Sequence, residues 1–290
     1  MQTPRDESVV VGELRLQYRD WGGSGQPIVL LHGLASTSHI WDLVAPILTN
    51  DFSVVALDQR GHGLSEKPDH GYDFASMTAD LHGFINALEL DKPLIIGHSW
   101  GGSVALEYAV THPDIPIGLC FVDGGTIEIS GRPGATLEKA REDMAPPIFN
   151  GVTIDQLKER ARSRQWFGSM TAQLEETMLA NFEVLEDNTI RARLSRENHM
   201  RIIDALWDHK PSTLYSSVKC PVLIMPARQD SGNDADSRRF RREDAVSVAN
   251  SKLPVSKTVW LEDSIHDVPL QRPQLVADVI IEYTQNGFFG

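Results

Sequence analysis

The chain has 290 residues, 41% of them hydrophobic, which is enough for one large domain to bury a core without disulfides or a structural metal. Lys and Arg number 27 against 40 Asp and Glu, and the resulting net charge of −13 argues against nucleic acid as a partner. The N-terminal residues lack the apolar segment of a signal peptide, and no apolar run approaches a membrane span. We therefore expect a cytoplasmic protein with no membrane partner.

Cysteines and clustered charges add little to this picture. Cys120 and Cys220 lie in or beside apolar runs, which predicts buried thiols and provides neither a disulfide framework nor metal-ligand spacing. A basic cluster at residues 238–242 is followed directly by Glu243 and Asp244. Because acidic residues adjoin it, a solvated helix face is the preferred interpretation over a phosphate site.

The first part of the chain alternates strand-like and helix-like segments. Residues 9–11 and 14–19 flank a Gly-Glu pair and predict an antiparallel hairpin. Apolar runs at 28–31 and 53–57 are typical of strands buried on both faces. Helices are predicted around residues 41–48 and 74–88. Strands that alternate with helices predict a parallel sheet with helices on both faces.

The next strand, turn and helix form the most informative stretch. An apolar run at residues 94–96 leads into Gly97-His98-Ser99-Trp100-Gly101, and a helix is predicted over 103–110. A serine at a sharp turn between strand and helix needs small residues two positions away on either side, which Gly97 and Gly101 provide. The helix directs its first N–H groups toward an oxyanion. The pattern predicts a nucleophile elbow with Ser99 at its apex.

Residues 127–215 interrupt the alternation. Amphipathic helices are predicted within this segment, with no clear buried strand between them: residues 136–143, 154–164, 169–183 and 196–208. Alternation then resumes with strands at 221–225 and 258–261 and helices at 239–251 and 273–283. We therefore predict an α/β core made of residues 1–126 and 216–290, and an inserted helical lid of residues 127–215.

These features together resemble the α/β-hydrolase fold family over nearly the whole chain, from about residue 9 to 283. Four motifs carry the resemblance: His32-Gly33, Asp58-x-Arg60-Gly61-His62-Gly63-x-Ser65, Gly97-His98-Ser99-Trp100-Gly101 and Ser264-Ile265-His266-Asp267. The resemblance implies a mostly parallel eight-stranded sheet covered by helices, and a nucleophile, acid and histidine in that chain order. It also implies that His32 fixes the loop that follows it and that Asp58, Arg60 and His62 are scaffold.

Chain order selects His266, among ten histidines, as the base for Ser99. The family usually places its acid after the strand at residues 221–225, which favours Asp230. Some relatives of this fold hold the acid at the end of the preceding strand, where Asp123 stands, so Asp123 remains the alternative. Either carboxylate would fix the tautomer of the imidazole and stabilise the imidazolium.

Other residues are expected around this triad. The backbone N–H groups of Leu34 and Trp100 should form an oxyanion hole. The candidate walls of a substrate pocket between the elbow and the lid are Gly33, His98, Trp41, Trp166, Phe167 and Trp207. Apolar walls favour a hydrophobic substrate, although aromatic residues at helical spacing also pack a lid onto its domain. His199 and His209, in the predicted lid, are interpreted as surface histidines.

Such a triad implies acyl transfer through an acyl-enzyme. We expect a serine hydrolase that cleaves a small to medium hydrophobic carboxylic ester or lactone, with no cofactor and no metal. Ser99 argues against the similar dehalogenases and epoxide hydrolases, which carry aspartate at the elbow. Two alternatives stay open. One is a carbon–carbon bond hydrolase of ring-cleavage products, in which Arg164 or Arg193 would hold a substrate carboxylate. The other is a hydrolase-fold ligand receptor with little turnover.

Overall fold

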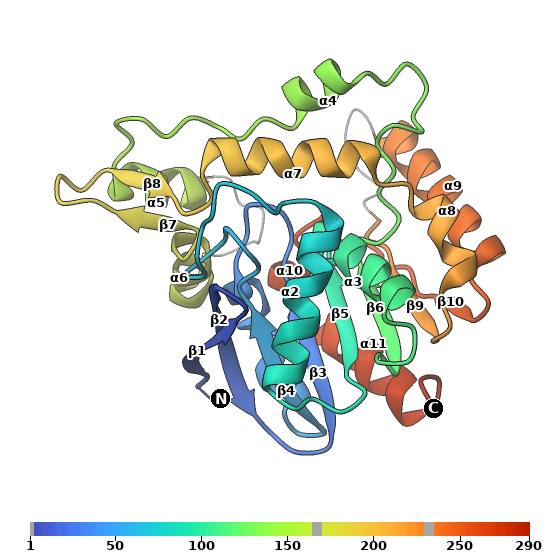
Figure 1. Ribbon diagram of the computed structural model, residues 1–290. Coiled ribbons are helices and arrows are strands. Elements are labelled where there is room, and N and C mark those ends of the chain that lie inside the picture. Colours follow the sequence, from blue (N-terminus) through green and yellow to red (C-terminus); the bar gives the residue numbers. More distant parts are fainter. Residues whose placement is uncertain (1–2, 164–169, 229–234) are drawn as a thin grey trace.

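The computed structural model describes residues 3–163, 170–228 and 235–290 (Figure 1). Within this part of the chain an eight-stranded sheet has the order β1-β2-β4-β3-β5-β6-β9-β10. Its strands are β1 (Arg5–Val11), β2 (Leu14–Gly22), β3 (Gln26–Leu31), β4 (Phe52–Leu57), β5 (Leu94–His98), β6 (Gly118–Val122), β9 (Val222–Met225) and β10 (Ser256–Thr258). The β1–β2 and β2–β4 pairs are antiparallel and the other neighbours are parallel, so the mostly parallel sheet is confirmed.

Helices cover both faces of the sheet because successive side chains of each buried strand point to opposite sides. On β3, Val29 and Leu31 enter one core while Ile28 and Leu30 enter the other. The first core is closed by α2 (Phe74–Ala87), α3 (Trp100–Thr111) and α9 (Ala235–Lys252). The second is closed by η1 (Ser38–Trp41), α1 (Ala45–Leu48), α10 (Val268–Gln271) and α11 (Pro273–Gln285).

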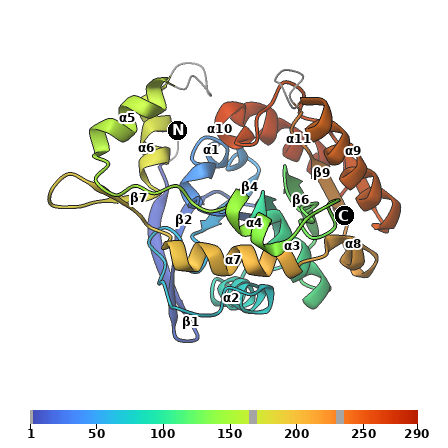
Figure 2. The same ribbon diagram turned by 90° about the horizontal axis from the view of Figure 1, so that it is seen from above.

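The segment between β6 and β9 contains α4 (Leu137–Asp143), α5 (Ile154–Ser163), α6 (Ala172–Leu179), β7 (Phe182–Val184), β8 (Ile190–Ala192), α7 (Arg196–Asp208), α8 (Pro211–Leu214) and η2 (Tyr215–Ser217). Figure 1 shows α4 and α7 above the strands, and α5, α6 and the hairpin of β7 and β8 to their left. Seen from above in Figure 2, α4 and α7 lie side by side, with α7 toward α2. Three of these helices, α4, α5 and α7, nearly coincide with predicted ones. No clear buried strand is expected here, and β7 and β8 form an antiparallel hairpin in which Ile190 alone is buried. The helix predicted over 169–183 is wrong at its end, where β7 begins. Strands of three residues are too short to produce a period-two pattern.

Helix α7 joins this segment to the core through buried polar contacts. Asn198 Nδ2 donates to Tyr72 Oη at 2.6 Å, which places the helix on the loop before α2. The ring of His209 stacks on Phe74, the first residue of α2, with centroids 4.1 Å apart. Within the segment itself, His199 Nε2 donates to the carbonyl oxygen of Met144 at 2.9 Å. Both histidines are buried, so the interpretation of surface histidines is wrong. His199 shares the apolar face of α7 that packs on the core.

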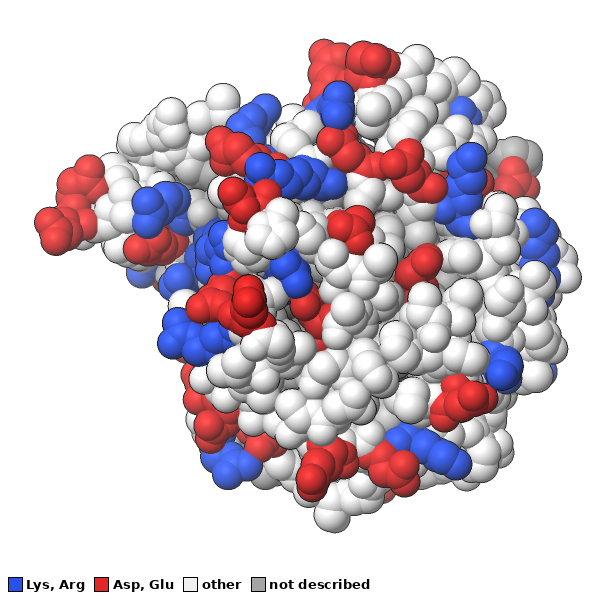
Figure 3. Space-filling model, viewed as in Figure 1, with Lys and Arg blue, Asp and Glu red and all other residues white. Residues whose placement is uncertain are grey.

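Acidic and basic side chains are interspersed over the face drawn in Figure 3.

Cys120 and Cys220 are both free and buried, as predicted. Among the described residues no helix has the length and apolar character needed to cross a bilayer.

Candidate active site

Ser99 stands at the turn between β5 and α3, with φ 52° and ψ −121°. A non-glycine residue at positive φ is strained, and packing of backbone on backbone keeps the turn in this state. A Cβ at Gly97 would lie 2.3 Å from backbone atoms of Gly101, and one at Gly101 would lie 2.6 Å from the carbonyl oxygen of His32. The glycines are therefore required where the sequence pattern places them, because no flexible side chain is available to move aside.

His266 follows β10 by a short loop, and its two ring nitrogens contact different partners. Nε2 lies 2.9 Å from Ser99 Oγ, and Nδ1 lies 2.6 Å from Asp123 Oδ2. The loop is held from behind, because His98 Nε2 donates to the carbonyl oxygen of His266 at 2.8 Å. With the Nδ1 proton directed to the carboxylate, Nε2 presents its lone pair to the serine hydroxyl. This is the tautomer that a general base requires.

Asp123 follows β6 directly, and its side chain is 3% exposed. The N–H of Ala227 donates to Oδ1 at 2.9 Å, while His266 and Arg242 donate to Oδ2 at 2.6 and 3.0 Å. Burial raises the pKa of Asp123, but the hydrogen bond and charge of His266, and then Arg242 and the amide, outweigh it and hold the pKa below its usual value. The carboxylate therefore stays ionised in the buried site.

The acid in contact with His266 is thus Asp123, which the sequence analysis holds as the alternative to Asp230. Asp230 itself lies outside the described residues. Family position points to the loop after β9, yet a local signal for Asp123 exists in the Gly124-Gly125 pair that follows it. A Cβ at Gly124 would lie 2.3 Å from the carbonyl oxygen of Ser99. The glycine lets the ends of β5 and β6 approach closely, which brings acid and serine to one place.

Opposing effects act on the pKa of His266, whose side chain is half-exposed. Burial lowers the pKa, but the hydrogen bond and charge of Asp123, together with the charge of Asp267, outweigh burial and raise it above its ordinary value. Arg242 acts in the opposite direction. Burial, followed by the charge of His266, lowers the pKa of His98 to about 4. The imidazole of His98 is therefore neutral near pH 7.

The loop that follows β3 packs against the serine. A Cβ at Gly33 would lie 3.1 Å from Ser99 Cβ, so only glycine allows this approach without displacement. His32 Nδ1 donates to the carbonyl oxygen of Gly33 at 2.7 Å, and its Nε2 accepts from the N–H of Gln59 at 3.0 Å. The loop that carries Leu34 is thus tied by His32 to the segment after β4.

His62 supports the same loop at Ala35, the residue that follows Leu34. Its Nε2 accepts from the N–H of Ala35 at 3.3 Å, and its Nδ1 donates to the carbonyl oxygen of Arg60 at 2.9 Å. The ring of Trp100 stacks on His62 at 5.3 Å. Trp100 is the first residue of α3, and the first N–H groups of a helix have no intrahelical acceptor.

The predicted pocket walls occupy different environments. Trp41 is fully buried in the core and meets His98 edge-on at 6.5 Å, so it is not a pocket wall. Trp207 is partly buried against the core cluster, where it packs the segment between β6 and β9 onto the sheet's helical layer. Trp166 and Phe167 lie outside the described residues. Leu34 keeps partial exposure beside Ser99, whereas Gly33 and His98 are buried behind it.

Arg242 is the residue of this site that sequence reasoning misses. The basic cluster to which it belongs is interpreted above as a solvated face, and for Arg242 that is wrong, because its guanidinium contacts Asp123. The local pattern contains no signal for this contact. The partner is 119 residues away, and only the packing of α9 brings the two together.

Comparisons with known proteins agree with this architecture. A family model described as "Alpha/beta hydrolase family" matches residues 28–279. A serine hydrolase-like protein of Danio rerio is 39% identical over 289 residues, covering 94% of this chain and 86% of that protein. A soluble epoxide hydrolase of Corynebacterium sp. (strain C12) is 44% identical over 101 residues, a match that spans only 35% of either chain. The crystal structure of E-2-(acetamidomethylene)succinate hydrolase has a TM-score of 0.76 at 22% identity, covering 97% of this chain and 99% of the other.

Proposed function

The chain belongs to the alpha/beta hydrolase family, and we propose that it is a serine hydrolase that cleaves a small to medium hydrophobic carboxylic ester or lactone through an acyl-enzyme. One observation carries the proposal. The imidazole of His266 is hydrogen-bonded on both sides. Its Nε2 lies 2.9 Å from Ser99 Oγ, and its Nδ1 lies 2.6 Å from Asp123 Oδ2. A serine hydroxyl is a poor nucleophile unless such a base accepts its proton.

In the first half of the reaction Ser99 Oγ attacks the substrate carbonyl while His266 Nε2 takes the hydroxyl proton. The N–H groups of Leu34 and Trp100 receive the developing oxyanion, and Asp123 stabilises the imidazolium. When the carbon–oxygen bond to the leaving group breaks, the imidazolium returns its proton to that oxygen. The acyl group then remains on Ser99 as an ester.

In the second half a water molecule repeats the attack on the acyl-enzyme. His266 Nε2 takes a proton from the water, the oxyanion forms again at the same N–H groups, and Ser99 leaves with the proton returned to it. His32 and His62 act only through the loop that they hold. Their role is to keep the Leu34 amide in place before substrate binds.

An apolar substrate is proposed because partly buried apolar side chains from the core and from the segment between β6 and β9 pack against one large hydrophobic cluster. They are Leu34, Ile127, Met144 and Trp207. We propose that residues 127–215 act as a lid over the substrate. Such a surface would bind an acyl chain by excluding water from it.

The serine distinguishes this proposal from the reactions of similar proteins. A soluble epoxide hydrolase matches part of this chain. The family resemblance implies an aspartate at the elbow of epoxide hydrolases and dehalogenases, where this chain carries Ser99. For carbon–carbon cleavage, Arg193 is a candidate to hold a substrate carboxylate. Its Nε donates instead to the carbonyl oxygen of Ala180 within the lid, and Arg164 lies outside the described residues. Ester hydrolysis is our first proposal, and carbon–carbon cleavage stays the alternative.

The test is hydrolysis of p-nitrophenyl esters from acetyl to decanoyl by the wild-type chain, by Ser99→Ala and by Ser103→Ala. Ser103 is a fully buried serine one turn further along α3 and provides a matched control. We expect Ser99→Ala to lower kcat by about 10⁴-fold or more and Ser103→Ala to keep it within about tenfold. The acyl group with the highest kcat/KM would then indicate the length of acyl chain that the site accommodates.

Two outcomes would contradict the proposal. Equal rates for Ser99→Ala and the wild type would remove Ser99 from the reaction. A wild-type chain that hydrolyses none of these esters, but whose melting temperature rises with an apolar ligand, would support the receptor alternative.

A further inference from the structure

Arg242 reaches the active site from α9, which packs on the same face of the sheet as α3. Its Nη2 donates to Asp123 Oδ2 at 3.0 Å, and this is the oxygen that accepts from His266 Nδ1 at 2.6 Å. Its Nη1 donates to the carbonyl oxygen of Ala227, whose N–H donates to Asp123 Oδ1. Arg242 and Ala227 together contact both oxygens of the carboxylate. The carboxylate is therefore clamped between a charged side chain and a backbone amide.

This ion pair differs from a surface salt bridge in its burial. The Asp123 side chain is 3% exposed and that of Arg242 is 36% exposed. Water screens a pair of exposed charges, whereas a carboxylate removed from water interacts more strongly with a nearby cation. An arginine also presents several N–H donors in one plane, so it restrains the orientation of its partner as well as its charge.

Four charged or titratable groups face His266 from the elements around it. They are Asp123 at the end of β6, Asp267 in the same loop, His98 at the end of β5 and Arg242 on α9. The two aspartates favour the imidazolium. His98 is neutral near pH 7, which leaves Arg242 as the cation of this described set that opposes the imidazolium.

We propose that Arg242 is a positioning residue of the active site, which orients the Asp123 carboxylate toward His266 and limits how strongly that carboxylate stabilises the imidazolium. This inference rests on the proposed function, because it assigns Arg242 a role in the same triad. A guanidinium on Oδ2 draws electron density from the oxygen that holds Nδ1–H. His266 consequently keeps its neutral, proton-accepting form to lower pH than the aspartates alone would allow.

The experiment follows the titration of His266 in the full-length chain by NMR, which needs no substrate, together with the pH profile of kcat/KM for p-nitrophenyl acetate. The variants are Arg242→Gln and Arg242→Lys. The matched control is Lys252→Gln on the same helix, because Lys252 donates to the carbonyl oxygen of Ser212 and not to the triad. Both readouts report the proton on His266, one directly and one through the rate.

We expect Arg242→Gln to raise the pKa of His266 by about half a unit to one unit, and to move the acid limb of kcat/KM upward by the same amount. Because the Asp123 carboxylate would no longer be held toward His266, Arg242→Gln should lower kcat more than it changes KM. Arg242→Lys, which keeps the charge, should keep the acid limb, and Lys252→Gln should match the wild type. If Arg242→Gln does not fold, Arg242→Met, which keeps an unbranched side chain without the charge, carries the same expectation.

An unchanged His266 titration in Arg242→Gln would overturn the inference, and so would an equal loss of rate at every pH. The NMR shift is independent of turnover. If Ser99→Ala kept full activity while the NMR shift was observed, the proposed function would fail and the electrostatic role of Arg242 would stand. If Ser99→Ala lost activity and the titration of Arg242→Gln was unchanged, only the present inference would fail.

Discussion

The carboxylate of Asp123 is placed by a backbone angle, φ 44°, that residues other than glycine, asparagine and aspartate rarely adopt. This left-handed turn at the end of β6 directs the side chain toward the loop of His266. The donors on its two oxygens, from Ala227, Arg242 and His266, are then sufficient to hold the charge of a carboxylate whose own side chain is 3% exposed. One residue thus combines strain, burial and charge, which is typical of functional positions.

We expect Asp123→Asn to lower kcat by about 10⁴-fold on the p-nitrophenyl ester with the highest wild-type rate. The amide of asparagine can donate to Nδ1, which would favour the tautomer with its proton on Nε2, facing Ser99. Asp230→Asn provides the comparison, since it alters the other candidate acid, and it should retain most of the wild-type rate. The reverse order of the two rates would assign the acid to Asp230.

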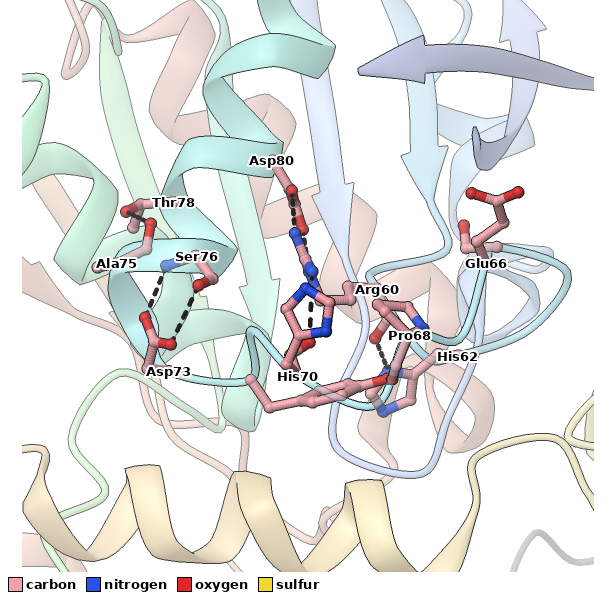
Figure 4. Close-up of polar contacts among 12 residues, drawn as sticks. Arg60, His62, Glu66, Pro68, His70, Asp73, Ala75, Ser76, Thr78 and Asp80 are labelled. Carbon is pink, nitrogen blue, oxygen red and sulfur yellow. Dashed lines mark hydrogen bonds and ion pairs between the residues drawn. The ribbon is translucent and has the colours of Figure 1, made fainter. Parts of the chain in front are cut away.

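At the level of elements, the segment between β4 and α2 is held by charged side chains. Arg60 forms two 2.7 Å hydrogen bonds to the two carboxylate oxygens of Asp80 on α2, as Figure 4 shows. Asp58 accepts from the backbone N–H groups of Ser38 and Leu64 at 2.7 and 2.9 Å. Both residues therefore order loops rather than react, in agreement with the scaffold interpretation.

We expect Asp80→Ala to lower the free energy of unfolding by about 3 to 5 kcal/mol, because it leaves the mostly buried guanidinium of Arg60 without its charged partner. Glu183→Ala, which breaks the exposed pair with Arg191 on the β7–β8 hairpin, should leave the free energy of unfolding nearly unchanged, because water screens that pair. Urea denaturation at pH 7 measures both. Equal shifts of the urea midpoint in Asp80→Ala and Glu183→Ala would show that burial does not decide how much an ion pair contributes to stability.

For the whole molecule, buried histidines link folding to pH. Burial is the largest cause of the lowered pKa of each of four histidines: His32, His62, His98 and His199. The unfolded chain binds protons at these groups near pH 6.5, whereas the folded chain does so only at lower pH. Their contribution to stability is therefore complete above pH 6.5 and is lost as the pH falls. His266, whose pKa is raised, acts in the opposite direction.

We expect the urea midpoint to fall between pH 7 and pH 5, where most carboxylates are still ionised in both states. Each buried histidine should contribute a slope of at most about 1.4 kcal/mol per pH unit. His199→Gln should reduce that slope, because burial lowers the pKa of His199 in the folded chain. A wild-type stability that is constant over this range would contradict the linkage.

Short-range patterns were sufficient for the features that depend on neighbouring residues. The spacing of glycines around Ser99, the alternation of strands with helices and the helix periods of α4, α5 and α7 are each contained in about twenty residues or fewer. A backbone clash at Gly97, or an apolar stripe on a helix, arises within such a window. These features were predictable because steric exclusion and burial act locally on the chain.

Contacts between distant residues were decided only by the tertiary structure. Which acid meets His266 depends on the close approach of β5 and β6, and the partner of Arg242 depends on how α9 lies against the sheet. The burial of His199 and Trp41 likewise depends on which faces pack together. Charge and hydrogen bonding act over a few ångströms in space and do not depend on separation along the chain, so the carboxylate that meets His266, and the guanidinium that contacts it, had to be located in three dimensions.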